Sequence, residues 1–238
     1  MTRADTQEAA WDAEYRRPRM LSPHNLPQAD VVRFVRALKK EGRRSGARVD
    51  LDEWQVLDLG SGTGRNAFYL AQQGAKVTGF EISDTALALA QKFARHAELS
   101  ITYLKQDIGA PYPLLDASMD LVLDVTSSNS LLEQGRRAYL SEVARVLKPD
   151  GYFFVRALCL DGDAHAKTLL RDRPGPEAGT YVLPDLGVVE RVFSEREFRD
   201  TYGARFRIES LDRTQHYASV SGRKFKRSYW LARMCRAD

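Results

Sequence analysis

The chain has 238 residues and a net charge of +4, and 43% of its residues are hydrophobic and 29% charged. These proportions are typical of a globular enzyme with one buried core. No apolar run approaches the roughly 18 residues of a membrane helix, so no membrane partner is expected. Residues 1–10 lack the apolar stretch of a secretory signal, which makes the cytoplasm the expected location. Cys159 and Cys235 are too few for a disulfide framework or a Cys-rich metal site, and no metal centre is predicted.

Basic residues gather in three short clusters, at 16–19, 39–48 and 223–227. Such clusters are usually solvated surface, although a basic surface also attracts anionic substrates and nucleic acid. Only Phe225 and Tyr229 provide aromatic side chains near the last cluster. Nucleic acid is therefore an unlikely partner on the composition.

The first predicted element of the core region is an amphipathic helix. Val31, Phe34, Val35 and Leu38 recur at helical spacing, and the run ends near Gly42. From residue 55 onward, buried strands alternate with helices. The predicted strands span 55–59, 75–80, 101–106, 120–125 and 152–157. The predicted helices run from about 65 to a stop at Gly74, from 84 to 96, and through Tyr139 to Leu147 before Pro149 and Gly151.

This alternation with short connections implies a parallel sheet with right-handed crossovers and helices on both faces. In such doubly wound sheets, ligands bind at the carboxyl ends of the strands. The pattern therefore locates the expected site before any motif is considered.

The composition after Leu158 shifts to Gly, Pro, Asp and Arg, and residues from about 158 to 190 are interpreted as an insertion or lid rather than a core element, with a plain surface loop as the alternative. Ser194 and Glu197 predict a capping box for a short helix that ends at Gly203. Two closing strands are expected at 205–211 and 228–234. The chain thus divides into an N-terminal cap and helix, residues 1–50, and a core with its lid, residues 51–238.

Three alternating glycines, Gly60, Gly62 and Gly64, directly follow the strand that contains Asp58. Glycine allows a tight turn and a close approach of the backbone to a ligand. The dinucleotide fingerprint requires a further glycine at position 65, where this chain has Arg65. Asp58 also suits a pyrophosphate poorly, whereas it could accept hydrogen bonds from an ammonium group or hold the loop in place.

Acidic residues end the next two strands. Glu81 lies 19 residues beyond Gly62, where a carboxylate can accept both hydroxyls of a ribose, and Asp107 ends the third strand. Two acidic strand ends beside a glycine turn suit a nucleoside that lacks phosphates and carries positive charge. S-adenosylmethionine fits this description better than NADP or ATP.

Across residues 55–157 the sequence resembles the class I S-adenosylmethionine-dependent methyltransferase family, through VLDLGSGTGRNAFYLA, GFEIS, LKQDI, MDLVLD and LKPDGYFFV in this order. The resemblance implies an α/β, doubly wound, Rossmann-like sheet of seven strands, mostly parallel with an antiparallel C-terminal hairpin. It also implies that the segment from Trp11 to Arg19 folds over the cofactor. The GRNAFYLA stretch is similar to small-molecule, tellurite-resistance-type methyltransferases.

The resemblance further implies roles for individual residues. The three glycines shape the methionine pocket, Glu81 binds ribose, and Asp107 and Ile108 flank adenine, while Asp124 faces the methionine end or the acceptor. The full set expected to bind S-adenosylmethionine is Asp58, Gly60, Ser61, Gly62, Thr63, Gly64, Glu81, Ile82, Asp107, Ile108 and Asp124.

Methyl transfer from a sulfonium needs no dedicated base, because it can succeed largely by holding donor and acceptor in line. Asp124, His165 and His216 could each remove a proton, but a structural role is the commoner one for such residues, so no catalytic base is assigned. The stretch from Asp124 to Asn129 lacks the Asn/Asp-Pro-Pro-aromatic motif of many nucleic-acid amino-methylating enzymes.

A small-molecule acceptor is therefore the leading hypothesis, with Tyr15, Arg19 and Asn129 as the expected acceptor contacts. Two alternatives remain open. The basic clusters would suit a methyltransferase acting on RNA or protein, and an intact glycine loop would also suit a non-catalytic S-adenosylmethionine-binding protein, because fold alone does not establish function.

Overall fold

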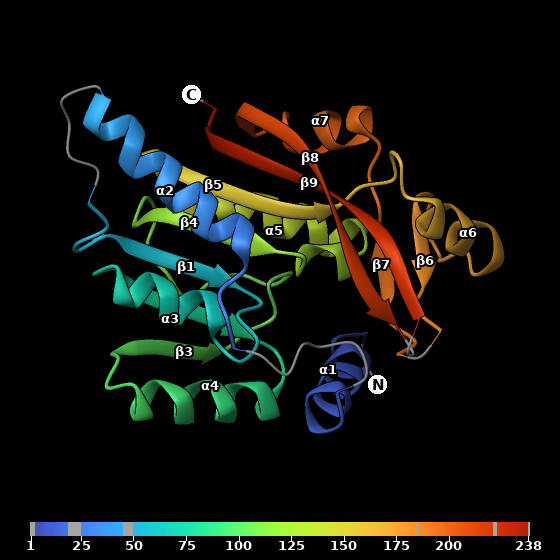
Figure 1. Cartoon of the computed structure of the whole chain (residues 1–238), viewed down its shortest axis with the longest axis horizontal. Coiled ribbons are helices and arrows are strands. Elements are labelled where there is room, and N and C mark those ends of the chain that lie inside the picture. The colour runs from blue at the N-terminus through green and yellow to red at the C-terminus, as the bar shows by residue number, and fades with distance from the viewer. Residues whose placement is uncertain (1–2, 19–24, 45–49, 185, 221–222, 238) are drawn as a thin grey trace.

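The computed structural model describes residues 3–18, 25–44, 50–184, 186–220 and 223–237. It confirms a seven-stranded sheet, with strand order β3-β2-β1-β4-β5-β9-β8 (Figure 1). The strands are β1 Gln55–Leu59, β2 Lys76–Glu81, β3 Ile101–Lys105, β4 Met119–Val125, β5 Leu147–Leu158, β8 Phe206–Val220 and β9 Arg223–Arg236. The first five are mutually parallel, and β9 pairs antiparallel with both β5 and β8.

Helices cover both faces of the sheet. They are α1 Arg3–Arg16, α2 Ala29–Arg44, α3 Arg65–Gln72, α4 Asp84–His96, the 3-10 turn η1 Ser128–Ser130, α5 Glu133–Val146, α6 Ala164–Asp172 and α7 Glu195–Tyr202. The capping box of α7 is confirmed, because Ser194 and Glu197 bond reciprocally and Gly203 follows the last turn. None of the described helices has both the length and the apolar run needed to cross a bilayer.

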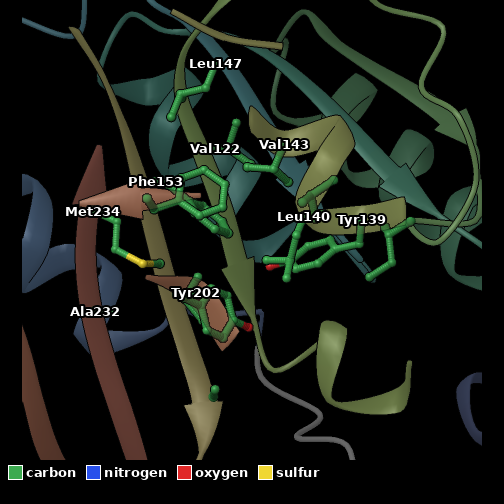
Figure 2. Close-up of a cluster of buried hydrophobic side chains, with 14 of the residues drawn as sticks. Val122, Tyr139, Leu140, Val143, Leu147, Phe153, Tyr202, Ala232 and Met234 are labelled. Atoms are coloured by element: carbon green, nitrogen blue, oxygen red, sulfur yellow. The ribbon is translucent and has the colours of Figure 1, made fainter. Parts of the chain in front are cut away.

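Successive strand residues point to opposite faces, so each buried strand serves two cores. Val56 and Leu121 pack with α2 and α3, whereas their neighbours Leu57 and Val122 pack with α5 and α7. Figure 2 shows the second core, where the buried Phe153 lies among side chains of α5, α7 and β9. Apolar runs without alternation therefore produce central strands buried on both sides.

The predicted start of the fifth strand was wrong. The strand begins at Leu147 rather than at Tyr152, and the residues expected to break the chain, Pro149 and Gly151, lie within it. The β4–β5 register shifts between Met119 and Leu121. Proline has no N–H to donate to the hydrogen bonds between strands, but it can occupy a strand where this pairing is irregular. The strand therefore continues through residues at which the sequence pattern predicts a stop.

The C-terminal hairpin is also longer than predicted. β8 and β9 pair from Phe206 with Arg236 to Val220 with Arg223, whereas β5 pairs only with Tyr229–Met234 of β9. The distal half of the hairpin projects beyond the parallel sheet (Figure 1). Its polar sequence has no regular apolar alternation. For this reason both strands were predicted to be shorter than they are.

The segment interpreted as a lid forms a small unit beside this projecting hairpin (Figure 1). It contains α6 and an antiparallel pair of strands, β6 Thr180–Val182 and β7 Val189–Arg191. Its apolar side chains pack on Tyr229, and the buried Asp163 accepts hydrogen bonds from Arg227 Nε and Ser228 N. The segment is therefore docked on β9; its role as a lid stays a prediction.

Candidate functional site

A cavity of about 530 Å³ lies along the carboxyl ends of the strands. Residues that follow β1, β2, β3 and β4 line it, together with one side chain each from β5 and β9. Helix α1 supplies Gln7, Trp11 and Tyr15 to its wall. The cavity therefore lies at the edge where a doubly wound sheet binds its ligands.

The glycine loop has a backbone conformation that other residues rarely adopt. Gly60 and Gly62 have φ of +64° and +57°. A Cβ at Gly60 would lie 2.4 Å from Ser127 Cβ, and a Cβ at Gly62 would lie 2.5 Å from the Tyr15 hydroxyl oxygen. The loop therefore needs glycine both for its turn and for the close approach of its neighbours.

Glu81 is buried and holds this loop against the end of β2. Its Oε2 accepts a hydrogen bond from Gly62 N at 2.9 Å, and its Oε1 accepts from Ile82 N and Ser83 N at 2.8 Å each. Burial raises the pKa of Glu81, although these hydrogen bonds oppose the shift. Because a carboxylate oxygen has more than one lone pair, Glu81 can also accept donors from the cavity that it lines.

The other predicted cofactor residues divide into two groups. Eight of them line the cavity: Gly60, Ser61, Gly62, Thr63, Glu81, Ile82, Asp107 and Ile108. The remaining three, Asp58, Gly64 and Asp124, lie behind its surface. Gly64 approaches Tyr103, whose hydroxyl oxygen would lie 2.3 Å from a Cβ at that position.

The two buried carboxylates behind the surface differ in their bonding. Asp124 accepts hydrogen bonds from Tyr139 Oη at 2.7 Å and from Ser127, so it fixes the loop that follows β4. Asp58 Oδ2 has no hydrogen-bond partner among the described residues. Burial raises the pKa of Asp58 to about 7, a shift that the charge of Arg65 opposes.

The comparisons with known proteins agree with this geometry. Residues 56–151 match the family model of the methyltransferase domain. This segment is therefore similar to the methyltransferase domain family. A solved structure concerned with conversion of a disulfide bond into a thioacetal group during echinomycin biosynthesis is similar across 96% of this chain and 92% of its own, with a TM-score of 0.70 and 25% identity. The 1,6-didemethyltoxoflavin-N1-methyltransferase of Burkholderia thailandensis shares the fold at a TM-score of 0.71 and 18% identity, over 99% of this chain and 89% of its own.

Two curated relatives match part of this chain in sequence. The phthiotriol/phenolphthiotriol dimycocerosates methyltransferase of Mycobacterium tuberculosis is 35% identical over 112 residues, which cover 46% of this chain and 40% of the relative. The fatty-acid O-methyltransferase of Mycolicibacterium smegmatis is 34% identical over 134 residues, which cover 55% of this chain and 47% of the relative. The chain thus spans less than half the length of these relatives.

The residues expected to contact the acceptor lie in different places. Tyr15 lines the cavity, whereas Arg19 lies outside the described residues. Asn129 does not line the cavity, because it is buried and its Oδ1 accepts from Leu158 N at 3.3 Å. His165 stacks on Phe225, and His216 bonds to Thr214; neither histidine lines the cavity.

Helix α1 is anchored across the site by Asp12 at the start of α4 and by Glu8, which pairs with Lys105 at the end of β3. Asp12 Oδ1 accepts hydrogen bonds from Ser83 Oγ and Thr85 N, both at 2.8 Å, at the start of α4. Burial opposes ionisation of Asp12, but these hydrogen bonds outweigh it and lower the pKa. The anchor is therefore an ionised group at neutral pH, and it holds Trp11 and Tyr15 in the cavity wall.

Replacing Asp12 with alanine should release α1 and reduce the affinity of the domain for S-adenosylhomocysteine by about tenfold, because hydrogen bonds to a charged group are lost. Amide hydrogen exchange in α1 should accelerate in the same variant. Asp172→Ala is the matched control, since Asp172 is exposed and bonds to its neighbour Arg171. Equal affinity and exchange in the two variants would show that Asp12 does not hold the helix.

Two cationic residues of the cavity wall were not predicted. Arg65 follows the glycine loop; on the sequence alone it served only to exclude the dinucleotide fingerprint. Arg156 lies on β5, and its guanidinium carbon is 3.4 Å from the centre of the Tyr229 ring. The available signal for Arg156 was a charged residue within the apolar run Phe153–Leu158. A charge buried in a central strand is costly unless it is paired or functional.

Proposed function

We propose that this protein is an S-adenosylmethionine-dependent methyltransferase that acts on a small molecule. The observation that carries the proposal is the buried Glu81 carboxylate, which bonds to Gly62 of the glycine loop and lines the same cavity. The tellurite-resistance-type branch remains part of the proposal, on the GRNAFYLA stretch.

The residues of the cavity fit this cofactor. Glu81 can accept the ribose hydroxyls, Asp107 and Ile108 flank the adenine, and the loop from Gly60 to Thr63 surrounds the methionine part. Two buried oxygens without partners among the described residues, Asp58 Oδ2 and Ser61 Oγ, lie in or directly behind this loop. When bound, the cofactor supplies a methyl group activated by a positive sulfonium. Three acidic side chains suit that charge and disfavour a pyrophosphate.

The chain's own part in the reaction is to position the acceptor and exclude water. No histidine, cysteine or lysine is among the described residues that line the cavity. Burial and the nearby charge of Glu81 raise the pKa of Tyr15, so its hydroxyl stays protonated and can only donate or accept a hydrogen bond. Positioning alone can accelerate an in-line displacement by several orders of magnitude.

Helix α1 favours a small acceptor over a macromolecular one. Tyr15 lies against Gly62 and Trp11 lines the same cavity, so side chains of α1 narrow the space that a nucleic-acid duplex would need. The names of the relatives point in the same direction, since they describe methylation of dimycocerosates, a fatty acid and a toxoflavin precursor.

The proposal is tested by transfer of a labelled methyl group from S-adenosylmethionine to separate pools of small acids, phenols and amines, of RNA, and of protein. Label should enter only a small-molecule pool. Binding to RNA should be weak and vanish near physiological salt, with a log-log slope of about 0.7 to 0.9 per phosphate contact. Label in RNA or protein would overturn the small-molecule assignment, and cofactor binding without transfer to any pool would favour a non-catalytic binding protein.

The raised pKa of Asp58 predicts a pH dependence of cofactor binding. A folded-state pKa of about 7 means that Asp58 is protonated below pH 7 in the free protein. A ligand ammonium beside it favours the carboxylate, so S-adenosylhomocysteine should bind more tightly at pH 8 than at pH 6 and release a proton on binding. Calorimetry in two buffers of different ionisation enthalpy measures both effects.

The control for this prediction is a second pair of variants. Asp58→Asn should remove the pH dependence, whereas Asp120→Asn should retain it, because Asp120 bonds to Lys148 and to Gln55 N away from the cavity. Equal affinity of the unmodified protein at the two pH values would contradict the role given to Asp58.

A further inference from the structure

The cavity extends beyond the part that Glu81 and Asp107 define. Those acids follow β2 and β3, whereas Arg156 and Tyr229 lie on β5 and β9 at the other end. β5 is three strands away from β2, roughly 14 Å at the usual spacing between strands. With the adenosine at the acidic end and the methionine over the glycine loop, the end at β5 and β9 is left for the acceptor.

Arg156 presents unpaired donors at this end. Its side chain is only 8% exposed, and its Nε donates to Asp30 Oδ2 at 3.0 Å. Its two terminal nitrogens donate to none of the described residues, although Arg156 lines the cavity. The guanidinium carbon lies 3.4 Å from the centre of the Tyr229 ring, a cation–π contact that helps hold the group in place. The free edge of the guanidinium is therefore a preformed fork of two N–H donors.

The local charge at this end is positive. Asp30 is shared, because it also pairs with Arg33 and lies 3.7 Å from His216 Nε2. Arg65 lines the same cavity and has no hydrogen bond or ion pair with a described residue. Burial and then the charge of Arg156 lower the pKa of Arg65, whereas the charge of Asp58 opposes the shift.

Asp58 is the carboxylate whose charge acts on Arg65, and Asp30 is shared between Arg33 and Arg156. The cofactor has one carboxylate, on its methionine part, and Arg65 adjoins the glycine loop that surrounds that part. Arg156 lies one step further along the sheet edge and is left without an anion from the cofactor. A planar fork with one net charge matches a carboxylate, which takes two parallel hydrogen bonds from one guanidinium.

We propose that Arg156, backed by Tyr229, binds the carboxylate of the acceptor, so that the substrate class of this enzyme is small organic carboxylic acids in their ionised form. This inference rests on the proposed function. It assigns substrate recognition to Arg156. The ion pair with Asp30 then serves to orient the Arg156 side chain toward the substrate.

The test uses calorimetry on the complex with S-adenosylhomocysteine. Benzoate and octanoate serve as carboxylate probes, and benzamide and octanamide as their neutral counterparts. At least one acid should bind about tenfold or more tightly than its amide, the effect of a hydrogen bond to a charged group. Equal affinity within both pairs, or no saturable binding of either acid up to about 10 mM, would overturn the inference.

Variants separate recognition from structural support. Arg156→Gln should remove the preference for the acid and leave the affinity for S-adenosylhomocysteine unchanged, and Arg156→Lys should restore part of the preference. Arg227→Gln is the matched control, because Arg227 is an equally buried arginine that pairs with Asp163 and does not line the cavity. Melting temperatures of both variants measure the structural cost.

The preference for the acid should survive in Arg227→Gln and be lost in Arg156→Gln. Survival of the preference in Arg156→Gln, or its equal loss in both variants, would assign Arg156 a purely structural role. Failure of the unmodified protein to bind S-adenosylhomocysteine would instead refute the proposed function, so the two failures are distinguishable.

Discussion

Gly62→Val should reduce the affinity for S-adenosylhomocysteine by about 100-fold or more, because two separate costs of roughly 1–3 kcal/mol combine. The first is the backbone, since a β-branched residue is strained at a φ of +57°. The second is space, since the new Cβ would lie 2.5 Å from the Tyr15 hydroxyl oxygen. Either the loop or α1 must move, and both shape the cavity.

Gly187→Val is the matched control for this prediction. Gly187 has a φ of +68°, and a Cβ there would meet nothing within 4 Å. This variant therefore carries the same kind of backbone strain without obstructing the cavity, and it should bind the cofactor like the unmodified protein. Calorimetry gives the affinities, and circular dichroism shows whether each variant is folded. Unchanged affinity in Gly62→Val would contradict the placement of the loop.

Glu81→Ala should weaken binding of the cofactor by roughly 1.5 to 3 kcal/mol, the usual range for hydrogen bonds to a charged group. The substitution removes the acceptor for the ribose and leaves the N–H groups of Gly62, Ile82 and Ser83 without their carboxylate. The protein should still fold, because the core on both faces of the sheet does not include this side chain.

Glu142→Ala is the control for Glu81. Glu142 likewise accepts a hydrogen bond from a backbone N–H, that of Tyr112, but it pairs with Arg145 and lies outside the cavity wall. Its variant should lose some stability and keep the affinity for the cofactor. If Glu81→Ala bound as tightly as the unmodified protein, the ribose assignment would be wrong.

The central part of the fold could be predicted because its signals are local. The strand from Gln55 to Leu59 has three apolar residues and Asp58 and leads into the glycine loop, and α4 was predicted from Asp84 to about His96, as observed. The position of Glu81 beside the loop also followed, because the carboxyl ends of neighbouring parallel strands meet at one edge.

The missed features depend on contacts between distant parts of the chain. Arg156 contacts Asp30, which is 126 residues away in the sequence, and Tyr229. The orientation of its side chain could therefore not be predicted from the apolar strand around it. Helix α1 has a polar sequence without a continuous apolar stripe, so its helical form was not predicted, although the resemblance implied that the segment from Trp11 folds over the cofactor. Contacts of Asp12 with the start of α4 and of Glu8 with Lys105 hold the helix in place.

The end of β4 shows the same limit. The resemblance implied that Asp124, at the end of the fourth strand, faces the methionine end or the acceptor. In the structure, Tyr139 of α5 and Ser127 of the following loop take its hydrogen-bonding capacity. Asp124 therefore shapes the cavity from behind. A sequence pattern places a residue at the end of a strand, but it does not show which neighbours compete for its side chain.

The most direct test of the central claim is a calorimetric titration of the purified protein with S-adenosylmethionine, S-adenosylhomocysteine and NAD. Glu81, Asp58 and the glycine loop should give saturable binding of both adenosyl compounds at one site per chain and no response to NAD. Saturable binding of NAD, with no response to either adenosyl compound, would contradict the assignment of the site.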